Sequence, residues 1–574
     1  MMSPRFQRRG MPAGDRASFP DAGLPALLAD LYVRRGMRGD ETDLSLRRLS
    51  PPTLLRGAGE AACLLADALA DGKHILIAGD FDADGATSSA LAKCALLACG
   101  AARVTTLIPD RFSMGYGLSP ALVKYAAGLS PDVLVTVDNG IASVEGVRLA
   151  REYGWRVVVT DHHLPGDTMP PADVIVDPNQ PGCDFPNKAL AGVGVIFYVM
   201  MRLRGELRAR GWFEQRGIAE PNLASLLDLV ALGTVADVVP LNHQNRILVE
   251  QGLRRIRAGE CRPGIRALFQ VAGRDPATAV ASDLGFSIGP RINAAGRLED
   301  MSLGVECLLA GDEQTALRHA SRLDELNRQR REVESDMVDE AQRILDGLDP
   351  SRGRTFGISL YESHWHQGVV GLVASRVKTR FHAPVFAFAR DGSGGLKGSG
   401  RSIAGVHLRD MLDRIDKLSP GLIGRFGGHA MAAGLTLPAE GFDAFSSLFD
   451  RVVREQLGGE PIGETVYTDG ELPGDALDLR TAELLRYAGP WGQDFPEPLF
   501  EGDFEIITQR IVGERHLKLI VQAVGDGGET TLDAIAFNHP ELPRTTFARL
   551  YYRLDVNAYR GNRSAQLIVE HIVA

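Results

Sequence analysis

The chain has 574 residues, more than a single hydrophobic core usually serves, so we expect three or four domains. With 44% hydrophobic residues, 24% charged residues and a formal net charge of −10, it has the composition of an ordinary globular protein, which excludes a strongly basic coat protein for nucleic acids. No secretory segment follows the basic N-terminus and no apolar run predicts a transmembrane helix, so a cytoplasmic location is expected.

The first half of the chain alternates predicted strands and helices. After a lead segment, 1–50, an alanine-rich helix ends at Gly72 and the apolar strand HILIAG follows; later strands end at Asp110, Asp138, Asp161 and Asp177. This alternation predicts a parallel sheet covered on both faces, which binds ligands at the carboxyl ends of its strands. The acids at those ends are therefore expected to converge, although any single one is equally well explained as a turn or N-cap residue.

The second half begins with a long polar helix, predicted over about 312–348 within a connecting segment, 301–350. A second α/β unit is expected over 351–459, and short strands separated by turns predict a small β-barrel over 460–574. The predicted fold class is therefore α/β. It comprises a parallel-sheet domain over 51–300, a second α/β lobe joined to it by the long helix, and a C-terminal barrel.

The segment GDFDADGATSSA carries the strongest chemical signal. Asp80, Asp82 and Asp84 alternate before Gly85, and three carboxylates so close together repel one another unless cations or protons neutralise them. Such a loop offers the hard oxygen ligands that Mg²⁺ and Mn²⁺ prefer. The spelling also matches the start of an EF-hand loop. That interpretation fails because the twelfth position is Leu91 instead of glutamate, and because a strand flanks the loop.

Three later motifs add candidate ligands. Asp138 ends a strand in VTVDNGI, and the strand VVVT is followed by Asp161, His162 and His163. Imidazole beside carboxylate is a mixed ligand set for Mn²⁺, Zn²⁺ or Fe²⁺. Adjacent residues at a strand end point in different directions, so one histidine could bind metal while the other faces substrate. Asp237 is a lone acid in an apolar stretch, where a carboxylate is costly unless it is paired or metal-bound.

These motifs, DFDADG, VDNG, DHH and GTVADVVPL in this order, resemble the DHH phosphoesterase superfamily. Further segments are similar to the bacterial single-strand-specific 5′-to-3′ exonucleases of that superfamily: RFSMGYGLS, IGPRINAAGRL, WHQGVVGLVASR, GSGRS and GGHAMAAG. WGQDFPEPLF, AIAFN and NAYRGNRSAQLIVE resemble their C-terminal OB-fold. The resemblance covers nearly the whole chain. It implies a DHH catalytic domain over 51–300, a DHHA1-type domain over 351–459 and an OB-fold nucleic-acid-binding domain over 460–574.

The resemblance also implies a site for two divalent cations, Mn²⁺ or Mg²⁺, which clamp the attacking and leaving oxygens of an in-line displacement and lower the pKa of bound water. Asp84 or Asp138 would bridge the pair. Ala78 stands where smaller DHH phosphatases have a histidine ligand, a contact that Asp80 would supply instead, and Phe81 replaces a tyrosine frequent in the family. The implied ligands are Asp80, Asp82, Asp84, Asp138, His162 and Asp237.

His163 completes the implied catalytic set, either by contacting the scissile phosphate or assisting proton transfer, or by orienting a neighbouring group. The implied substrate contacts are Arg111, Tyr116, Arg291, Ser399, Arg401 and His429, since arginine pairs bidentately with phosphate and a glycine-rich turn such as GSGRS can present N–H groups to it. The alternative for each of them is a residue that forms a surface salt bridge or lies in a turn. In the OB-fold the candidates are Trp491, Tyr552 and Tyr559 for stacking and Arg560 and Arg563 for phosphates, each alternatively a core or turn residue.

The function implied is that of a metal-dependent exonuclease that degrades single-stranded DNA from its 5′ end to 5′-mononucleotides, in DNA repair and recombination. A monomer is expected, with a single-strand-binding protein and a helicase as candidate partners. A DHH phosphodiesterase acting on short oligonucleotides or cyclic dinucleotides is the alternative, but it would resemble only the first two domains, and a pyrophosphatase would need no OB-like domain. A non-catalytic DNA-binding scaffold would be expected to have lost ligands that this chain retains.

Overall fold

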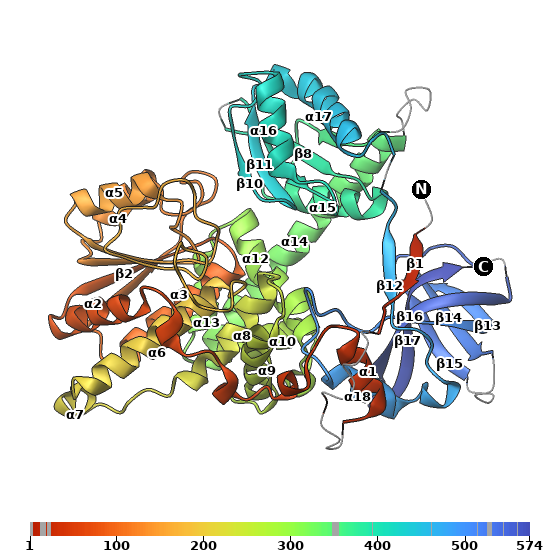
Figure 1. The fold of residues 1–574 in the computed structure, drawn as a ribbon, viewed down its shortest axis with the longest axis horizontal. Helices are drawn as coiled ribbons and strands as arrows, with labels where there is room; N and C mark the ends of the chain where they lie inside the picture. The colour runs from red at the N-terminus through yellow and green to blue at the C-terminus, as the bar shows by residue number, and fades with distance from the viewer. Residues whose placement is uncertain are drawn as a thin grey trace. The chain divides into compact units, whose positions relative to one another are not determined.

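The computed structural model describes residues 4–11, 19, 24–346, 355–392, 394–460, 462–513, 515–524, 531–543, 545–559 and 561–573 (Figure 1). The chain divides into two compact units. The smaller comprises Met1–Gln7 and Glu325–Val466, and the larger comprises Arg8–Asp324 and Tyr467–Ala574. The long helix α14 (Glu313–Asp346) runs along the chain from the larger unit into the smaller one, close to its predicted span. Among the described residues, no helix is both long and apolar enough to cross a membrane.

A five-stranded parallel sheet forms one core of the larger unit, as the strand–helix alternation predicted. Its strand order is β3-β2-β4-β5-β6. The chain first continues from β2 to its neighbour β3 on one side, and then crosses back to β4 on the other side of β2. The carboxyl ends of β2 and β4 therefore flank a topological switch point, the place where open α/β sheets bind ligands. The strands are β2 (His74–Gly79), β3 (Arg103–Leu107), β4 (Val133–Val137), β5 (Arg156–Thr160) and β6 (Val174–Val176).

Helices cover both faces of this sheet (Figure 1). Helices α4 and α5 bury Leu122 and Val147 against Leu134 and Val157 on one face, and α2, α3 and α6 lie on the other. A further helical layer packs on α3 and α6 through α8. The helices are α1 (Ala26–Val33), α2 (Ala58–Ala70), α3 (Ala83–Ala98), α4 (Pro120–Ala127), α5 (Val144–Glu152), α6 (Gly192–Ala209), α7 (Trp212–Arg216), α8 (Leu227–Ala236), α9 (His243–Arg257), α10 (Pro263–Val271), α11 (Ala281–Asp283), the π-helix η7 (Leu284–Ile288), α12 (Gly289–Leu298) and α13 (Ser302–Leu309).

The larger unit also contains a closed five-stranded barrel, as predicted for the C-terminal region. Its strand order is β13-β14-β15-β17-β16, with β15 and β17 parallel and the other pairs antiparallel. Inward-facing Phe504, Leu519 and Leu567 fill the interior. The elements are α18 (Leu479–Tyr487), β13 (Phe500–Val512), β14 (His516–Ala523), β15 (Thr531–Ala536), β16 (Phe547–Tyr559) and β17 (Asn562–Val573).

The smaller unit is built on a mixed sheet with the order β10-β11-β9-β8-β7, in which only β7 and β8 are parallel to each other. Its core is aromatic, because Phe386 and Phe388 of β8 pack against Phe445 and Phe449 of α17. The elements are β7 (Ile358–Tyr361), α15 (Val370–Phe381), β8 (Val385–Arg390), β9 (Leu396–Arg401), α16 (Leu408–Leu418), β10 (Arg425–Gly428), β11 (Ala432–Leu437) and α17 (Phe442–Gln456). Separately, β1 (Arg5–Arg8) pairs with β12 (Thr465–Thr468).

Candidate active site

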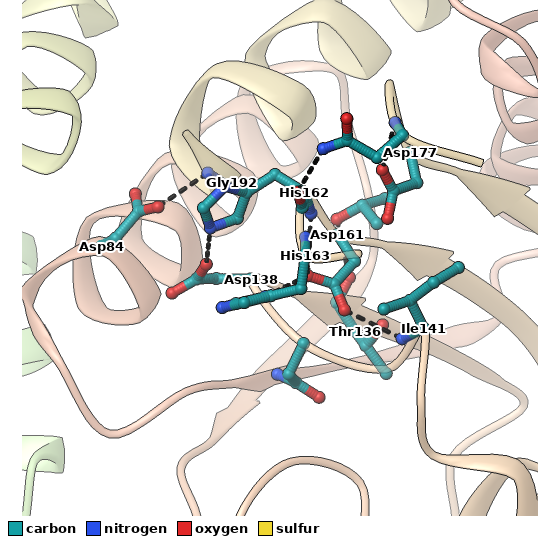
Figure 2. A network of polar contacts seen from close by, with 12 residues as sticks. Asp84, Thr136, Asp138, Ile141, Asp161, His162, His163, Asp177 and Gly192 are labelled. Carbon is teal, nitrogen blue, oxygen red and sulfur yellow. Dashed lines mark hydrogen bonds and ion pairs between the residues drawn. The ribbon is translucent and has the colours of Figure 1, made fainter. Parts of the chain in front are cut away.

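Acids and a histidine pair converge at the switch point of the parallel sheet (Figure 2). Asp80 and Asp82 follow β2, Asp138 follows β4, and the histidine pair follows β5, while Asp237 is the C-cap residue of α8. Potential ligand atoms lie within 4.8 Å of one another in three combinations here: Asp80–Asp82–Asp138, Asp84–His162–Asp237, and Asp138–His162–His163. The structure therefore brings together every residue proposed as a metal ligand from the sequence.

The start of α6 holds one of these carboxylates in place. The backbone N–H groups of Gly192 and Val193 donate to the two oxygens of Asp84 at 2.6 and 2.9 Å. Gly192 packs so closely that a Cβ there would lie 2.6 Å from Cβ of Asp138, so only glycine fits. This support was not predicted from the sequence, where it leaves one signal, a run of small residues, LAGVG, before an apolar helix.

The carboxylates of the cluster have raised pKa values. Burial, followed by the charge of Asp82, raises the pKa of Asp84 to about 7, even though two N–H groups favour its ionised form. Burial and neighbouring acids likewise raise the pKa of Asp80, Asp138 and Asp237. Within the described part of the chain, no lysine or arginine forms an ion pair with these acids. The cluster therefore concentrates negative charge that a bound cation would stabilise.

Asp161 orients the histidine pair (Figure 2). Its Oδ1 accepts hydrogen bonds from the backbone N–H of His162 at 2.8 Å and from Nδ1 of His163 at 2.7 Å. Burial opposes the charged form of His163, but the hydrogen bond and charge of Asp161 outweigh it and raise the pKa of His163 to about 9. Nε2 of His162 lies 3.1 Å from Oδ1 of Asp138, and the side-chain amide of Asn179 donates to the backbone carbonyl of His162 at 2.6 Å. Each histidine therefore presents Nε2 in a defined direction.

Two of the predicted substrate contacts lie beside this cluster. The guanidinium of Arg111 lies 4.2 Å from the ring centroid of Phe81 and donates to the carbonyl of Gly296 at 3.3 Å. The hydroxyl of Tyr116 lies 3.3 Å from Nε2 of His163. Arg291 is engaged elsewhere, because its guanidinium forms an ion pair with Asp324 at 2.8 Å.

Two of the other predicted contacts belong to β9 of the smaller unit. Nη1 of Arg401 donates to Oγ of Ser399 at 3.3 Å and to the carbonyl of Gly400 at 2.8 Å, and burial lowers the pKa of Arg401. Among the described residues no carboxylate pairs with this guanidinium. Gly371, in the first turn of α15, packs so closely that a Cβ there would lie 2.9 Å from Oγ of Ser399. A half-buried cation, a hydroxyl and a helix N-terminus thus lie together, a combination that suits an anion.

The third predicted contact in this unit, His429, lies in the turn between β10 and β11. It is exposed, and its backbone N–H donates to the carbonyl of Ala432 at 2.7 Å.

The structure also places several other candidates, and for Asp110 and Tyr552 it decides between the two interpretations. Asp110 accepts a hydrogen bond from the N–H of Phe112 at 2.7 Å and is a turn residue, as its alternative interpretation held. Tyr552 is 1% exposed inside the barrel and cannot stack on a base. Trp491 is half-buried and stacks on Phe495, and Arg563 pairs with Glu483. The backbone of Tyr559 is described but its side chain is not, and Arg560 lies outside the described residues.

Three family models match the chain: the DHH family N-terminal domain over 74–234, the DHHA1 domain over 355–455 and the RecJ OB domain over 468–571. The chain is 56% identical over 572 residues to the single-stranded-DNA-specific exonuclease RecJ of Dickeya dadantii, covering 99% of both chains, and 51% identical over 578 residues to that of Escherichia coli, covering 100% of both. The crystal structure of Thermus thermophilus RecJ in complex with Mn²⁺ matches with a TM-score of 0.80 and 31% identity, over 99% of this chain and 79% of that one.

Proposed function

The chain belongs to the RecJ family of DHH phosphoesterases, and from this premise we propose that it is a metal-dependent exonuclease that degrades single-stranded DNA from the 5′ end. The observation that carries the proposal is the cluster of Asp80, Asp82, Asp84, Asp138, His162 and Asp237 at the switch point of the parallel sheet. Full-length similarity, barrel included, favours this function over a phosphodiesterase for short oligonucleotides or cyclic dinucleotides, whose resemblance would stop before the barrel.

The residues of the cluster fit divalent cations. Oδ1 of Asp80 is buried without a hydrogen-bond partner in the described part of the chain, although a buried carboxylate oxygen normally has one. Carboxylates with an imidazole are ligands for Mn²⁺ and also supply the oxygens that Mg²⁺ prefers. Asp80, Asp82, Asp84, Asp138, His162 and Asp237 would hold the ions, and Mn²⁺ or Mg²⁺ is the proposed cofactor. When bound, such ions neutralise charge that develops on the phosphate and lower the pKa of a coordinated water.

His163 is proposed to act on the phosphate through Nε2. Because Nδ1 donates to Asp161, Nε2 is the ring atom left to face the substrate, and the raised pKa keeps a proton on it. In hydrolysis a water oxygen bonds to phosphorus, the bond from phosphorus to the 3′ oxygen breaks, and a proton reaches that oxygen. Nε2 of His163 is positioned to donate a hydrogen bond to the phosphate, while Asp161 fixes the ring. The products are a 5′-mononucleotide and a strand with a new 5′-phosphate.

Recognition of the 5′ end is proposed for the anion site of the smaller unit. Arg401, Ser399 and the first turn of α15 would bind the terminal phosphate, because a guanidinium without a carboxylate partner gains most from a doubly charged anion. We propose Arg111 and Tyr116 as contacts near the reacting phosphate and His429 as a further contact. In this scheme the domain over 51–300 hydrolyses the phosphodiester bond. The domain over 351–459 binds the 5′ end of the strand, and the domain over 460–574 binds the rest of the strand.

The proposed substrate, single-stranded DNA, also implies which kind of reaction must supply it. An enzyme that acts only on single strands depends on a reaction that opens the duplex, so we propose a helicase and a single-strand-binding protein as partners in repair and recombination. The proposed location is the cytoplasm and the proposed state a monomer.

The test uses a strand labelled at its 5′ end, the same strand labelled at its 3′ end, and the duplex as a control. With Mn²⁺ or Mg²⁺, the 5′ label is expected to appear at once as a mononucleotide, the 3′ label only when the strand is consumed, and EDTA is expected to stop both. A duplex degraded as fast as the single strand would contradict the strand specificity, and mononucleotides released first from the 3′ label would contradict the direction. Cyclic dinucleotides cleaved in preference to long strands would favour the alternative.

A further inference from the structure

A pocket of about 470 Å³ lies in the larger unit, next to the segment that carries Asp237. Val235 and Val238, on either side of Asp237 in the sequence, belong to its lining. Consecutive Cα atoms are about 3.8 Å apart, so the pocket begins immediately beside a proposed metal ligand. Val238 has a φ of 60°, which a β-branched residue rarely adopts, and such strain concentrates at functional sites. The wall of the pocket is thus built together with the end of α8.

The same pocket reaches the segment that leads into the barrel. Its lining also includes Trp491 and Gln493, together with Arg553 on β16, and the N–H of Leu241 donates to the carbonyl of Gln493 at 2.8 Å. The pocket therefore lies between the metal cluster and the barrel, the two parts of the larger unit to which we assign contacts with the DNA strand.

Phe286 is the most exposed aromatic residue in the lining of this pocket, ahead of Tyr487. It lies on the π-helix η7, and its side chain is 85% exposed, a poor environment for a phenyl ring in water. The π-helix and the first residue of α12 pack closely on α8: a Cβ at Gly285 would lie 3.2 Å from Cγ1 of Val235, and a Cβ at Gly289 would lie 3.1 Å from Cβ of Ala236. Phe286 is thus held on a rigid support beside the helix that ends at Asp237, as a stacking platform requires.

The charges of the lining indicate what the pocket accepts. Its three arginines are each paired with an acid that also lines it: Arg257 with Glu250 at 2.9 Å, Arg486 with Asp555 at 3.0 Å and Arg553 with Glu497 at 2.7 Å. The lining carries no net charge, so it offers little attraction to a phosphate. An uncharged aromatic group with polar edges, which a nucleobase is, matches both the apolar walls and the polar groups of Ser282 and Gln493.

We propose that this pocket is a nucleobase subsite, in which Phe286 stacks on a base of the substrate strand downstream of the scissile phosphate. The proposal rests on the proposed function, since it deepens the contact with that same strand. Stacking recognises every base through its π-face, so the subsite would hold the strand without selecting a sequence. It would keep the strand beside Asp237 while the terminal nucleotide is removed.

The test pairs a protein variant with a missing base. Strands labelled at the 5′ end carry one abasic sugar at successive positions behind the first nucleotide, and kcat/KM is measured for release of that nucleotide with Mn²⁺. Phe286→Ala should lower kcat/KM on the complete strand by roughly 5- to 150-fold, the range for loss of one stacked base. The wild type should suffer a similar loss at one abasic position, and the two losses should not multiply. Phe286→Trp should restore activity.

Tyr125→Ala is the matched control, because Tyr125 is an exposed aromatic residue on α4 outside the pocket, and it should leave every rate unchanged. If Phe286→Ala equals the wild type, or if its loss multiplies with that of every abasic position, the subsite is wrong and an apolar segment of a partner protein becomes the better occupant. Both of those outcomes require an active wild type. A wild type that releases no nucleotide would instead contradict the proposed function itself.

Discussion

Acidic side chains gather at two places in the larger unit, and the two groups are built in opposite ways. Around β2 and β4, buried carboxylates face one another, and among the described residues none pairs with a lysine or arginine. Beside the barrel, acids alternate with cations: Arg549 pairs with Glu471 at 2.7 Å and with Asp503 at 2.9 Å, and Arg8 pairs with Glu471 and with buried Glu501. We call the first cluster unbalanced, and the second balanced because each of its three acids has an arginine partner.

The pKa values show what the difference means. Burial and like charge raise the pKa of Asp138, whereas the hydrogen bond and charge of Arg549 lower the pKa of Glu471. A group whose charged form is favoured in the fold stabilises the protein near neutral pH, while one whose charged form is disfavoured costs stability until a ligand compensates it. A concentration of charge therefore indicates a ligand site only where the fold leaves it unbalanced.

The largest expected effect is on the unbalanced cluster. Asparagine tolerates the φ of 61° at Asp138 and keeps the size of the side chain, but it removes the charge. Asp138→Asn should lower the rate of DNA hydrolysis by at least about 10²–10³-fold. In EDTA its melting temperature should equal or exceed that of the wild type, because a buried repulsion is removed. Activity within a few-fold of wild type would contradict the metal assignment.

Arg401 is the reverse case, a half-buried cation that pairs with no acid among the described residues, and its loss should affect one substrate more than another. A hydrogen bond to a charged group contributes about 1.5–3 kcal/mol, so Arg401→Ala should lower kcat/KM on a 5′-phosphorylated strand by roughly 10- to 150-fold. A strand with a 5′-hydroxyl should lose much less, and Arg401→Lys should recover part of the difference. Equal losses on both strands would show that the guanidinium does not bind the end.

The balanced cluster should respond in stability and not in activity. Glu501→Gln leaves Arg8 and Arg549 without their buried partner and should lower the free energy of unfolding by about 1–3 kcal/mol, measured by urea denaturation. Glu505→Gln on the same strand is the control, because no ion pair of Glu505 occurs among the described residues, and it should change little. If the rate of hydrolysis fell by more than the fraction of folded protein, the balanced cluster would contribute to activity and the prediction would be contradicted.

The smallest expected effect is a pH dependence of the metal-free protein. A carboxyl group whose pKa is higher in the folded than in the unfolded protein binds its proton more tightly in the folded protein. Its contribution to the free energy of unfolding is therefore fully present below the unfolded pKa of about 3.9 and is lost as the pH rises. For Asp84 that loss is complete near its pKa of about 7. In EDTA, the stability of the wild type relative to Asp138→Asn should therefore fall as the pH rises above about 4, and Mn²⁺ should remove the fall. A difference that grows with pH would contradict the raised pKa values.

The convergence of the candidate ligands was predictable because four of the six have the same local signature. Asp80, Asp82, Asp138 and His162 follow apolar strands, and parallel strands bring their carboxyl ends to one edge whatever packs around them. The stacking residues of the barrel were less predictable. An aromatic residue in a strand can face either side, and Tyr552 faces inward. Strand alternation decides between the two faces only when the register is known.

The sequence by itself determined the family, the three-part architecture and the residues that converge at the switch point, because these depend on short motifs and on the order of strands and helices. Only the tertiary structure decided which charges are balanced, that Gly192 of α6 supports Asp84, and that Phe286 stands exposed beside a pocket shared by two parts of the chain. These features are contacts between residues far apart in sequence. Their partners are selected by packing, and no local pattern encodes them.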